Sequence, residues 1–499
     1  MDANDTAARI SNLLKPGSTL SQRVVRGGFW VFALRLTNRL LGLASTIILA
    51  RVLAPSDFGL FGIALLAMAA LDTFSQVGLN AAMIQKKEDI APYLDTAWTV
   101  QAIRGGLLAL LLFAAAPYVA VFFGTPAAKP ILQVIGLSTL IQGFTNIGVI
   151  YFNKELEFHK QYVYQLSGTL ANVGVAITAV LLLKSVWALV FGLLAGNLVQ
   201  MVVSYIIHPY RPRPRLDLGQ FKELFHFGKW VLGSSMLVYL ITQGDNIMVG
   251  KLLDVAALGF YQMAYRISNL PATEITHVIS QVTFPAYAKL QTNMAKLKEA
   301  YLKVLQLTAF LSFPVAGLIF VLAPDFTRIF LGDKWLPMVP AMQVLVFAGL
   351  LRSIAATAGP IFIAVGKPLI DMQGQCLRLL TLIILIYPLT IKYGFIGTSI
   401  SVVLSTLSIT IWFMFKVNQI TECEIGKFIR MTLFPFLSML FMMIIAMGII
   451  RNLGVISIWL IMMLTILCSL FYLLLIYILD RLAIYPIMKL MKDQFATIK

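Results

Sequence analysis

The sequence ILARVLAPSDFGLFGIA (Ile48–Ala64) returns without a gap as MVGKLLDVAALGFYQMA (Met248–Ala264). The two copies lie 200 positions apart in strongly apolar sequence, and matching residues extend upstream to Gly28 and Gly228. Duplicated membrane bundles are a recurrent architecture of transporters, which bind their substrate between the halves. The repeat therefore predicts two related bundles of membrane helices.

The composition is that of an integral membrane protein. The 499-residue chain is 59% hydrophobic and 12% charged, whereas a soluble domain is about a quarter charged. Apolar stretches long enough to cross a hydrocarbon core of about 30 Å recur along the whole chain. The net charge of +17 is spread over short loops between these stretches, which argues against a nucleic-acid partner.

Fourteen transmembrane helices are expected from the apolar stretches. Their approximate ranges are 27–50, 56–84, 93–122, 127–150, 162–183, 186–208, 226–250, 256–288, 300–323, 337–364, 369–391, 394–415, 428–449 and 455–479. With the N-terminus inside, the cytoplasmic segments hold 25 Lys and Arg residues and the opposite loops hold 8. Because cytoplasmic loops are enriched in Lys and Arg, both termini are expected in the cytoplasm. Six helices separate the two copies of the repeat, so the halves are expected to be parallel copies.

These helices predict six parts of the chain. They are a cytoplasmic tail (1–26), an N-terminal six-helix bundle (27–208), a basic cytoplasmic linker (209–225), a C-terminal six-helix bundle (226–416), two additional transmembrane helices (417–480) and a cytoplasmic C-terminal tail (481–499). The linker contains the run Arg211–Arg215, RPRPR. A connection that follows the positive-inside rule is the favoured interpretation, and a polyproline-type ligand for a partner protein is the alternative.

Charged side chains within the expected spans are the candidate functional residues, because a charge at the bilayer centre costs about 2.5–3.5 kcal/mol on insertion scales. The candidates are six arginines and four carboxylates: Arg35, Arg39, Arg104, Arg266, Arg352, Arg378, Asp72, Asp245, Glu274 and Asp371. The surplus positive charge suits a large anionic ligand, since guanidinium groups bind phosphate and carboxylate in a bidentate manner. Ion pairs that lock helices together, or side chains that snorkel to the membrane surface, are the alternative interpretation.

The intramembrane charges predict two kinds of site. Asp72 and Glu274 fall near the middle of repeat-equivalent helices, and a carboxylate in a low dielectric binds protons readily, so both are candidates for coupling protons or cations. Asp245 is a third candidate, or a structural partner for an arginine. Four arginines are candidate substrate-binding residues of a central cavity: Arg35, Arg39, Arg266 and Arg378.

No sequence motif supports catalysis, a metal site or a cofactor. The chain lacks a Walker lysine loop, GxSxG and HExxH, and its four histidines are dispersed. The longest expected extracytoplasmic loop, about Ala323–Leu336, is too short for an active-site domain. The sequence therefore predicts a protein that is not an enzyme, with transport driven by an ion gradient, by the substrate gradient or by consumption of the product.

The turn Ala50–Gly59 carries the pattern Ala-Arg-x-Leu-x-Pro-x-Asp-Phe-Gly. In this turn the chain resembles the polysaccharide flippases of the multidrug/oligosaccharidyl-lipid/polysaccharide exporter superfamily. The segments GLNAAMIQKKE (Gly78–Glu88) and GDKWLPMVPAMQVL (Gly332–Leu345) are similar to its colanic-acid-exporter branch. The resemblance covers about residues 20–480. Four motif residues are expected to be structural, with Asp57 capping the second helix: Arg51, Pro55, Asp57 and Gly59.

The resemblance implies a fold like that of the multidrug and toxin extrusion transporters. Two six-helix bundles would form a V around a central cavity, with two further helices. The implied function is a flippase that moves undecaprenyl-pyrophosphate-linked oligosaccharide across the bacterial inner membrane by alternating access, for export of exopolysaccharide, capsule or O-antigen. The implied partners are this lipid-linked oligosaccharide, the bilayer, and the polysaccharide polymerase and glycosyltransferases.

Four alternatives remain open from the sequence. A cation-coupled multidrug antiporter of the same fold predicts a cavity of carboxylates and aromatic residues, whereas arginines predominate here. A lipid II flippase would also have a cationic cavity. A membrane glycosyltransferase needs larger extramembrane loops than this chain has. A pure scaffold of the polysaccharide machinery leaves the costly intramembrane charges unexplained.

Overall fold

The computed structural model describes residues 20–75, 82–84, 89–270, 272–273, 283, 287–422, 424–453 and 457–482. Within these ranges the regular elements are helices, with no β-strand among them. Ten helices are long and apolar enough to span a bilayer, and a bent pair formed by Ala128–Gly143 and Ile147–Lys154 is an eleventh candidate. The expected all-α membrane fold is confirmed, and the number of described spans is compatible with fourteen.

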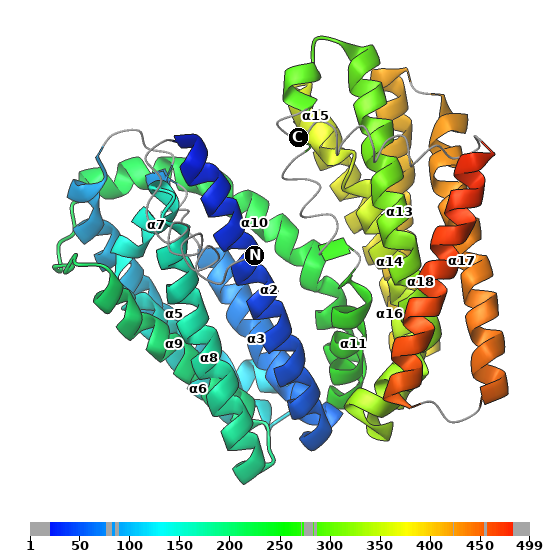
Figure 1. Ribbon diagram of the computed structural model, residues 1–499. Coiled ribbons are helices and arrows are strands. Elements are labelled where there is room, and N and C mark those ends of the chain that lie inside the picture. The colour runs from blue at the N-terminus through cyan, green and yellow to red at the C-terminus, as the bar shows by residue number, and fades with distance from the viewer. Residues whose placement is uncertain are drawn as a thin grey trace, which may run out of the picture. The chain divides into compact units, whose positions relative to one another are not determined.

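The chain forms two compact units, Met1–Gln243 (unit 1) and Gly244–Lys499 (unit 2), and the boundary lies within helix α10 (Figure 1). The helices of unit 1 are α2 (Leu20–Val52), α3 (Pro55–Ser75), α5 (Leu94–Phe122), α6 (Ala128–Gly143), α7 (Ile150–Lys154), α8 (Phe158–Leu183), α9 (Trp187–Ile207) and the first part of α10 (Leu218–Leu252). Unit 2 holds the rest of α10, then α11 (Val255–Ser268), α13 (Met294–Phe326), α14 (Val339–Ala355), α15 (Gly359–Ala364), α16 (Pro368–Thr421), α17 (Ile425–Leu453) and α18 (Ile458–Arg481).

The sequence repeat is a structural repeat. In the first copy α2 ends at Val52 and α3 begins at Pro55, and in the second copy α10 ends at Leu252 and α11 begins at Val255. The same offset of 200 positions therefore relates both helix ends and both helix starts. This agreement confirms that the chain contains two copies of one helical unit.

A hydrogen bond between a side chain and the backbone stabilises the tight turn in each copy. In the first copy the Ala54 N–H donates to Asp57 Oδ2 at 2.9 Å. In the second copy the Ala257 N–H donates to Asp254 Oδ1 at 2.6 Å. The two bonds join equivalent positions in opposite directions, because the aspartate is the third residue of the helix in one copy and the N-cap in the other.

Helices α8 and α9 of unit 1 pack closely because glycines lie at their contact. A Cβ atom added to Gly192 would lie 2.7 Å from Cβ of Ala176, and one added to Gly196 would lie 3.0 Å from the carbonyl oxygen of Gly168. Small residues four positions apart are the usual means by which membrane helices approach each other. This contact fixes the wall of unit 1 that carries the pocket described below.

Helix α16 consists of two antiparallel helices joined at Gly394. There the backbone leaves the helical conformation, with φ 60° and ψ −146°, a conformation that glycine tolerates. The hydroxyls of Thr390 and Thr398 lie 2.7 Å apart, and Thr381 Oγ1 donates to Ser408 Oγ at 3.3 Å. These pairs close a helical hairpin, in agreement with the two spans expected at 369–391 and 394–415.

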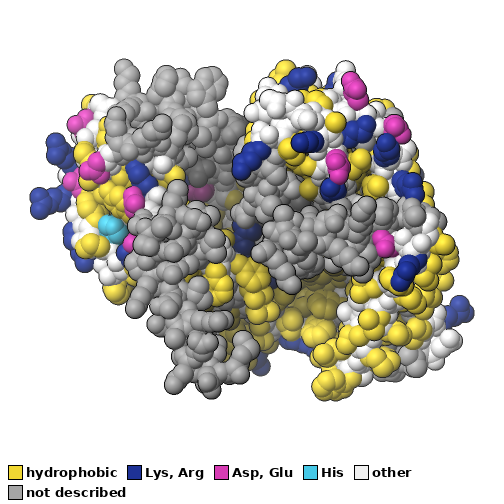
Figure 2. Space-filling model, turned by 45° about the horizontal axis from the view of Figure 1, so that its top comes forward, with side chains coloured by type: hydrophobic (Ala, Val, Ile, Leu, Met, Phe, Trp, Pro, Cys, Tyr) yellow, Lys and Arg dark blue, Asp and Glu magenta, His cyan; other side chains and the backbone are white. Residues whose placement is uncertain are grey.

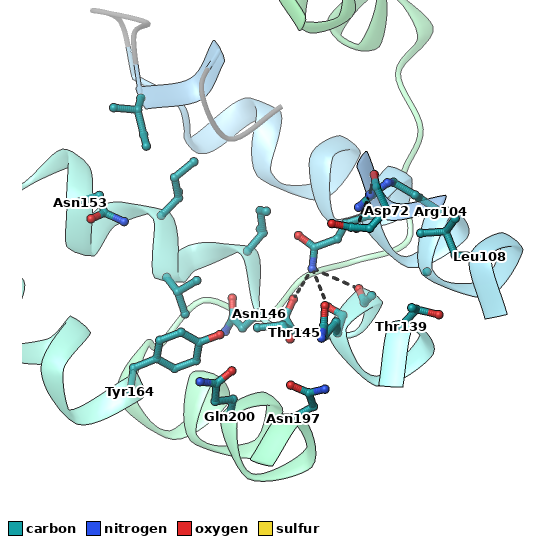
Figure 3. Close-up of a pocket in the computed structure, with 18 residues that line it drawn as sticks. Asp72, Arg104, Leu108, Thr139, Thr145, Asn146, Asn153, Tyr164, Asn197 and Gln200 are labelled. Carbon is teal, nitrogen blue, oxygen red and sulfur yellow. Dashed lines mark hydrogen bonds and ion pairs between the residues drawn. The ribbon is translucent and has the colours of Figure 1, made fainter. Parts of the chain in front are cut away.

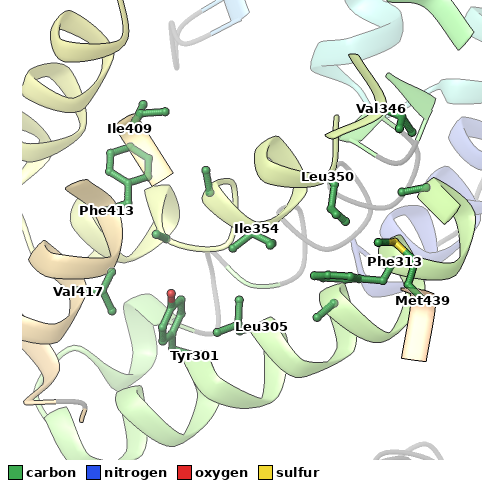
Figure 4. Packing of buried hydrophobic residues seen from close by; sticks show 14 of the residues in the cluster. Tyr301, Leu305, Phe313, Val346, Leu350, Ile354, Ile409, Phe413, Val417 and Met439 are labelled. Atoms are coloured by element: carbon green, nitrogen blue, oxygen red, sulfur yellow. The ribbon is translucent and has the colours of Figure 1, made fainter. Parts of the chain in front are cut away.

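The core of unit 2 is apolar and continuous. It is built from buried side chains of α13, α14, α16, α17 and α18, among them Leu305, Phe313, Ile354 and Phe413 (Figure 4). Large apolar side chains also cover the outer helix surfaces, such as Ile384 of α16, which is 68% exposed. Exposed apolar surface of this kind is suited to contact with lipid.

Basic side chains gather at one end of unit 2. In the body at the right of Figure 2, Lys and Arg side chains cluster over the upper end, and hydrophobic side chains cover the lower flank. This separation is typical of a membrane protein that has a charged end in water and an apolar belt in lipid.

The segment expected as a cytoplasmic linker is hydrogen-bonded to α5. The N–H groups of Arg213 and Arg215 donate to Asp95 Oδ1 and Thr99 Oγ1 of α5, each at 2.9 Å. The Tyr210 hydroxyl also donates to Asp95, and burial together with this carboxylate raises the pKa of Tyr210, which keeps the phenol protonated. Because its backbone is held by α5, the segment fits a structural connection better than a ligand for a partner.

The range expected for this linker includes the start of a helix. Helix α10 begins at Leu218, before the end expected for the linker at residue 225. Hydropathy did not mark this start, because the first turns of α10 mix polar and apolar residues and follow the proline-rich run directly. The other expected domain boundaries stay predictions.

Candidate functional site

Unit 1 contains a polar pocket of about 450 Å³, lined by residues of α3, α5, α6, α7, α8 and α9. Its size lies within the range of small-molecule sites, about 300–1,000 Å³. Figure 3 shows Tyr164, Gln200 and Asn197 in a row on one side of the pocket, away from Asp72 and Arg104. Most of the polar groups come from side-chain amides and hydroxyls, so the pocket is a candidate binding site rather than a catalytic one.

Gln101 of α5 fixes the wall of the pocket formed by the end of α6. Its Nε2 group lies 3.2 Å from each of three carbonyl oxygens, those of Gln142, Gly143 and Thr145. The last carbonyl groups of a helix have no partner within the helix, and Gln101 supplies one. The contact is possible because α5 and α6 cross closely, since a Cβ atom on Gly105 would lie 2.8 Å from Cα of Gly143.

An ion pair borders the same pocket. Arg104 Nη2 lies 2.5 Å from Asp72 Oδ1, and Arg104 also donates to the carbonyl oxygens of Asp72 and Ser75. The Asp72 side chain is 50% exposed and that of Arg104 is 26% exposed. The pair therefore joins α3 to α5 at a site that solvent reaches, and Asp72 is accessible to a proton or cation.

A second polar cluster lies within unit 2. The Asp245 carboxylate is 2% exposed and accepts hydrogen bonds from the Tyr261 hydroxyl at 2.7 Å and from the Asn246 N–H at 2.8 Å. It also faces the positive charges of Arg352 and Arg378. Buried charges are paired or hydrogen-bonded in folded proteins, and Asp245 is hydrogen-bonded.

Arg352 and Arg378 give this cluster a surplus of positive charge. Arg352 Nη1 donates to the Tyr265 hydroxyl and, at 3.0 Å, to Asn269 Oδ1, and its guanidinium lies 5.0 Å from the centroid of the Tyr265 ring. Arg378 of α16 interacts electrostatically with Arg352, Tyr265 and Asp245. Among the described residues, two guanidinium groups therefore act on one carboxylate in this cluster.

The structure brings only some of the expected site residues together. Asp245 and Arg378 belong to the cluster of unit 2, whereas Arg266 lies exposed in the last turn of α11. Arg35 and Arg39 are half-buried on α2. Glu274 lies outside the described residues, so its expected symmetry with Asp72 remains a prediction.

The motif residues lie around the turn between α2 and α3. Arg51 is exposed in the last turn of α2, Pro55 is the first residue of α3, and Gly59 is buried within α3. Asp57 binds the N–H of Ala54, as described above. None of these four residues borders the pocket of unit 1, and their structural role stays a prediction.

The sequence interpretation missed the glutamines of the pocket. Gln101, Gln142 and Gln200 lie on three different helices, and single amides within apolar spans are commonly used for helix–helix hydrogen bonds. Nothing in their spacing indicates that they converge. For metals, no group of three or more His, Cys, Asp or Glu residues converges among the residues that the structure describes.

Comparison with known proteins places this fold in a family. A family model described as "Polysaccharide biosynthesis protein" matches residues 48–340. The chain belongs to this family. The match contains both copies of the repeat and more than half of the chain.

Several curated proteins are similar to this chain. The lipopolysaccharide biosynthesis protein WzxC of Escherichia coli is 26% identical over 352 residues, which cover 69% of this chain and 71% of WzxC. The succinoglycan biosynthesis transport protein ExoT of Rhizobium meliloti is 24% identical over 321 residues, with 64% of this chain and 65% of ExoT covered. An uncharacterized membrane protein in the cps region of Klebsiella pneumoniae is 23% identical over 433 residues, 86% of this chain and 89% of that protein.

Solved structures show the same fold. The lipid II flippase MurJ, in an inward closed conformation, has a TM-score of 0.74 at 16% identity and covers 91% of this chain and 99% of its own. A multidrug resistance transporter of the MATE family, facing inward, has a TM-score of 0.61 at 16% identity and covers 78% of this chain and 96% of its own. With its apolar helices, the chain is therefore a multi-pass membrane protein that shares its fold with these two proteins.

Proposed function

We propose that this protein is a flippase that moves undecaprenyl-pyrophosphate-linked oligosaccharide across the bacterial inner membrane for surface polysaccharide export. The observation that carries the proposal is the family match over residues 48–340 on a MurJ-like fold. WzxC and ExoT are named for lipopolysaccharide biosynthesis and succinoglycan transport. The chain therefore combines membership of a polysaccharide biosynthesis family with a fold that it shares with a lipid II flippase.

The intramembrane arginines supply the chemistry that such a substrate needs. A pyrophosphate group carries several negative charges, and guanidinium groups bind phosphate through paired, charge-assisted hydrogen bonds. Arg35 and Arg39 are four residues apart and share one face of α2. Together with Arg378 and Arg266, they are the proposed contacts for the pyrophosphate and for acidic sugars.

Alternating access is the proposed mechanism. The two repeats would expose the substrate site first to the cytoplasm and then to the outside, and the undecaprenyl chain would stay in the bilayer. Asp72, Asp245 and Glu274 are the proposed coupling sites. Protonation of Asp72 would weaken its ion pair with Arg104, which links uptake of a proton to the contact between α3 and α5.

The cellular setting follows from the same proposal. Both termini would lie in the cytoplasm, where the oligosaccharide is assembled, and glycosyltransferases and the polysaccharide polymerase would act before and after transport. No chemical step is required of the flippase itself. A lipid II flippase is the second candidate, because MurJ shares the fold over 91% of this chain.

The proposal is tested in a strain that lacks this protein. Its lipids are extracted and analysed by mass spectrometry while surface polysaccharide is quantified. A complete undecaprenyl-pyrophosphate oligosaccharide should accumulate as surface polysaccharide disappears. Accumulation of lipid II would select the second candidate, a truncated oligosaccharide would indicate a glycosyltransferase, and normal lipids with new drug sensitivity would indicate a multidrug antiporter.

A further inference from the structure

The pocket of unit 1 has an unusual lining for a membrane bundle. It combines six side-chain amides with two threonines and a tyrosine, all from the described residues: Gln101, Gln142, Asn146, Asn153, Asn197, Gln200, Thr139, Thr145 and Tyr164. A buried amide without a hydrogen-bonding partner costs free energy in an apolar environment. A set of this size in one pocket therefore points to a polar ligand or to water.

The charge of the lining narrows the choice of ligand. Asp72 and Arg104 are the charged side chains among the described lining residues, and they neutralise each other at 2.5 Å. The pocket thus offers no surplus charge to a phosphate or to an organic cation. It differs in this respect from the cluster of unit 2, where Arg352 and Arg378 face the single carboxylate of Asp245.

Some of the lining side chains form hydrogen bonds within the protein, and others have none among the described residues. Gln101 binds the carbonyl groups at the end of α6, Asn146 donates to the carbonyl oxygen of Tyr210 at 2.7 Å, and Asn197 donates to the Ser138 hydroxyl. Among the described residues, no hydrogen-bonding partner is found for the side chains of Gln142, Gln200, Asn153 and Tyr164. The first group shapes the pocket and the second group is free to meet a ligand.

A glycine makes room for one of the available amides. A Cβ atom added to Gly168 of α8 would lie 2.3 Å from Cγ and 2.6 Å from Nε2 of Gln200 on α9. Gln200 therefore lies across the bare backbone of Gly168 and extends along the pocket wall. Any larger residue at position 168 would displace the amide.

We propose that this pocket binds sugar residues of the transported oligosaccharide, an inference that rests on the proposed function. Neutral sugars present hydroxyl groups that both donate and accept hydrogen bonds, and a carboxamide offers both a donor and an acceptor in one plane. The neutral lining suits the sugars, whereas the arginines proposed above suit the pyrophosphate. Gln142 and Gln200 are the specific contacts assigned to the sugar.

The test is a binding measurement on the full-length protein in lipid nanodiscs. The probe is the free oligosaccharide, released by mild acid from the lipid-linked intermediate so that it carries neither lipid nor pyrophosphate. Titration calorimetry compares the wild type with the double variant Gln142→Leu/Gln200→Leu. The matched control is Gln133→Leu, which removes an amide from α6 outside the pocket lining.

The wild type and the Gln133→Leu control should bind the oligosaccharide equally. The double variant should bind about tenfold more weakly, as expected for the loss of two hydrogen bonds. Inorganic pyrophosphate should not displace the oligosaccharide, because the pocket has no surplus positive charge. Asn153→Leu, at an exposed position of α7, is the second variant if the double variant does not fold, and it should also weaken binding.

Two results would overturn the inference. Equal binding by the wild type and the pocket variants, or no binding by any form, would mean that the pocket is not a sugar site. Displacement by pyrophosphate would show instead that Arg104 makes the pocket an anion site. The proposed function is judged separately, because the strain lacking the protein still accumulates, or fails to accumulate, the lipid-linked oligosaccharide.

Discussion

Asp57 and Asp254 stabilise the equivalent turns of the two copies, and each accepts a hydrogen bond from the opposite end of its turn. In the first copy the carboxylate accepts from the N–H three residues earlier, and in the second it accepts from the N–H three residues later. The positions that are bonded, 54 with 57 and 254 with 257, are equivalent in the repeat. The turn therefore constrains the pair of positions, and either position can supply the aspartate.

The equivalence of these positions predicts what happens when the aspartate is moved from position 57 to position 54. Asp57→Ala should lower the free energy of unfolding by about 1 kcal/mol, the usual cost of losing a helix cap. Adding Ala54→Asp to that variant should restore most of the loss, because it recreates the arrangement of the second copy. Thermal unfolding of the purified protein in detergent checks both steps. A double variant less stable than Asp57→Ala alone would show that the two copies do not use equivalent links.

The arginines of the proposed substrate site predict a selective loss of transport. Arg35→Ala, Arg39→Ala and Arg378→Ala should each reduce surface polysaccharide about tenfold at equal protein level, because each removes a charge-assisted contact to the substrate. Lys129→Ala, at an exposed position in the first turn of α6, is the control and should leave output unchanged. Normal output from all three arginine variants would exclude the proposed cavity role.

The sequence identified candidate site residues where a side chain is energetically costly within a membrane. Arg352, Arg378 and Asp245 stand out in an apolar sequence because a charge within a membrane needs a reason. Gln101 and Gln142 did not stand out, because a single amide in a membrane span commonly forms a hydrogen bond with a neighbouring helix. Their importance depends on convergence in three dimensions, which no pattern along the chain records.

At the scale of helices, the hairpin of α16 depends on two glycines. Gly394 adopts the positive φ that reverses the chain, and Gly397 lies so close to the returning helix that an added Cβ would be 1.8 Å from the carbonyl oxygen of Leu389. Neither residue contacts a ligand site. They act by allowing the two halves to pack against each other.

Gly397→Ala should therefore destabilise the protein by about 1–3 kcal/mol, the typical cost of overpacking. The matched control is Gly448→Ala in α17, where an added Cβ meets nothing within 4 Å. The control should unfold at the same temperature as the wild type or slightly above it, since alanine is the better helix former. Equal unfolding temperatures for both variants would contradict the close approach at Leu389.

Helix positions were largely predictable, because apolar length alone identifies a membrane span. The break near residue 394 was also predictable from a short polar interruption. The path of residues 210–217 was not, because it depends on hydrogen bonds to Asp95 and Thr99, far away in sequence. The early start of α10 was missed because its first turns mix polar and apolar residues and do not form a long apolar stretch.

At the scale of the whole molecule, the two repeats share their helix ends but differ in their polar groups. Unit 1 holds a neutral pocket rich in amides, and unit 2 holds a cluster with surplus positive charge. A substrate made of neutral sugars and a pyrophosphate group has both kinds of chemistry. A substrate with two chemically different parts would require the two copies to differ in their polar groups.

The orientation of the whole chain is a further prediction. Both termini should lie in the cytoplasm, because Lys and Arg residues predominate on that side of the membrane. Green fluorescent protein fused to the C-terminus should therefore fluoresce, and alkaline phosphatase fused there should be inactive. The same phosphatase placed after Lys184, at the opposite end of α8, should be active. The reverse pattern would invert the topology.

The central claim, that this protein moves a lipid-linked oligosaccharide between leaflets, is tested most directly in vesicles. Purified protein is reconstituted with undecaprenyl-pyrophosphate oligosaccharide, and a membrane-impermeant glycosidase is added outside. With the protein present, nearly all of the oligosaccharide should become susceptible, whereas protein-free vesicles should protect the fraction in the inner leaflet. Equal protection with and without the protein, in vesicles of equal integrity, would contradict the assignment as a flippase.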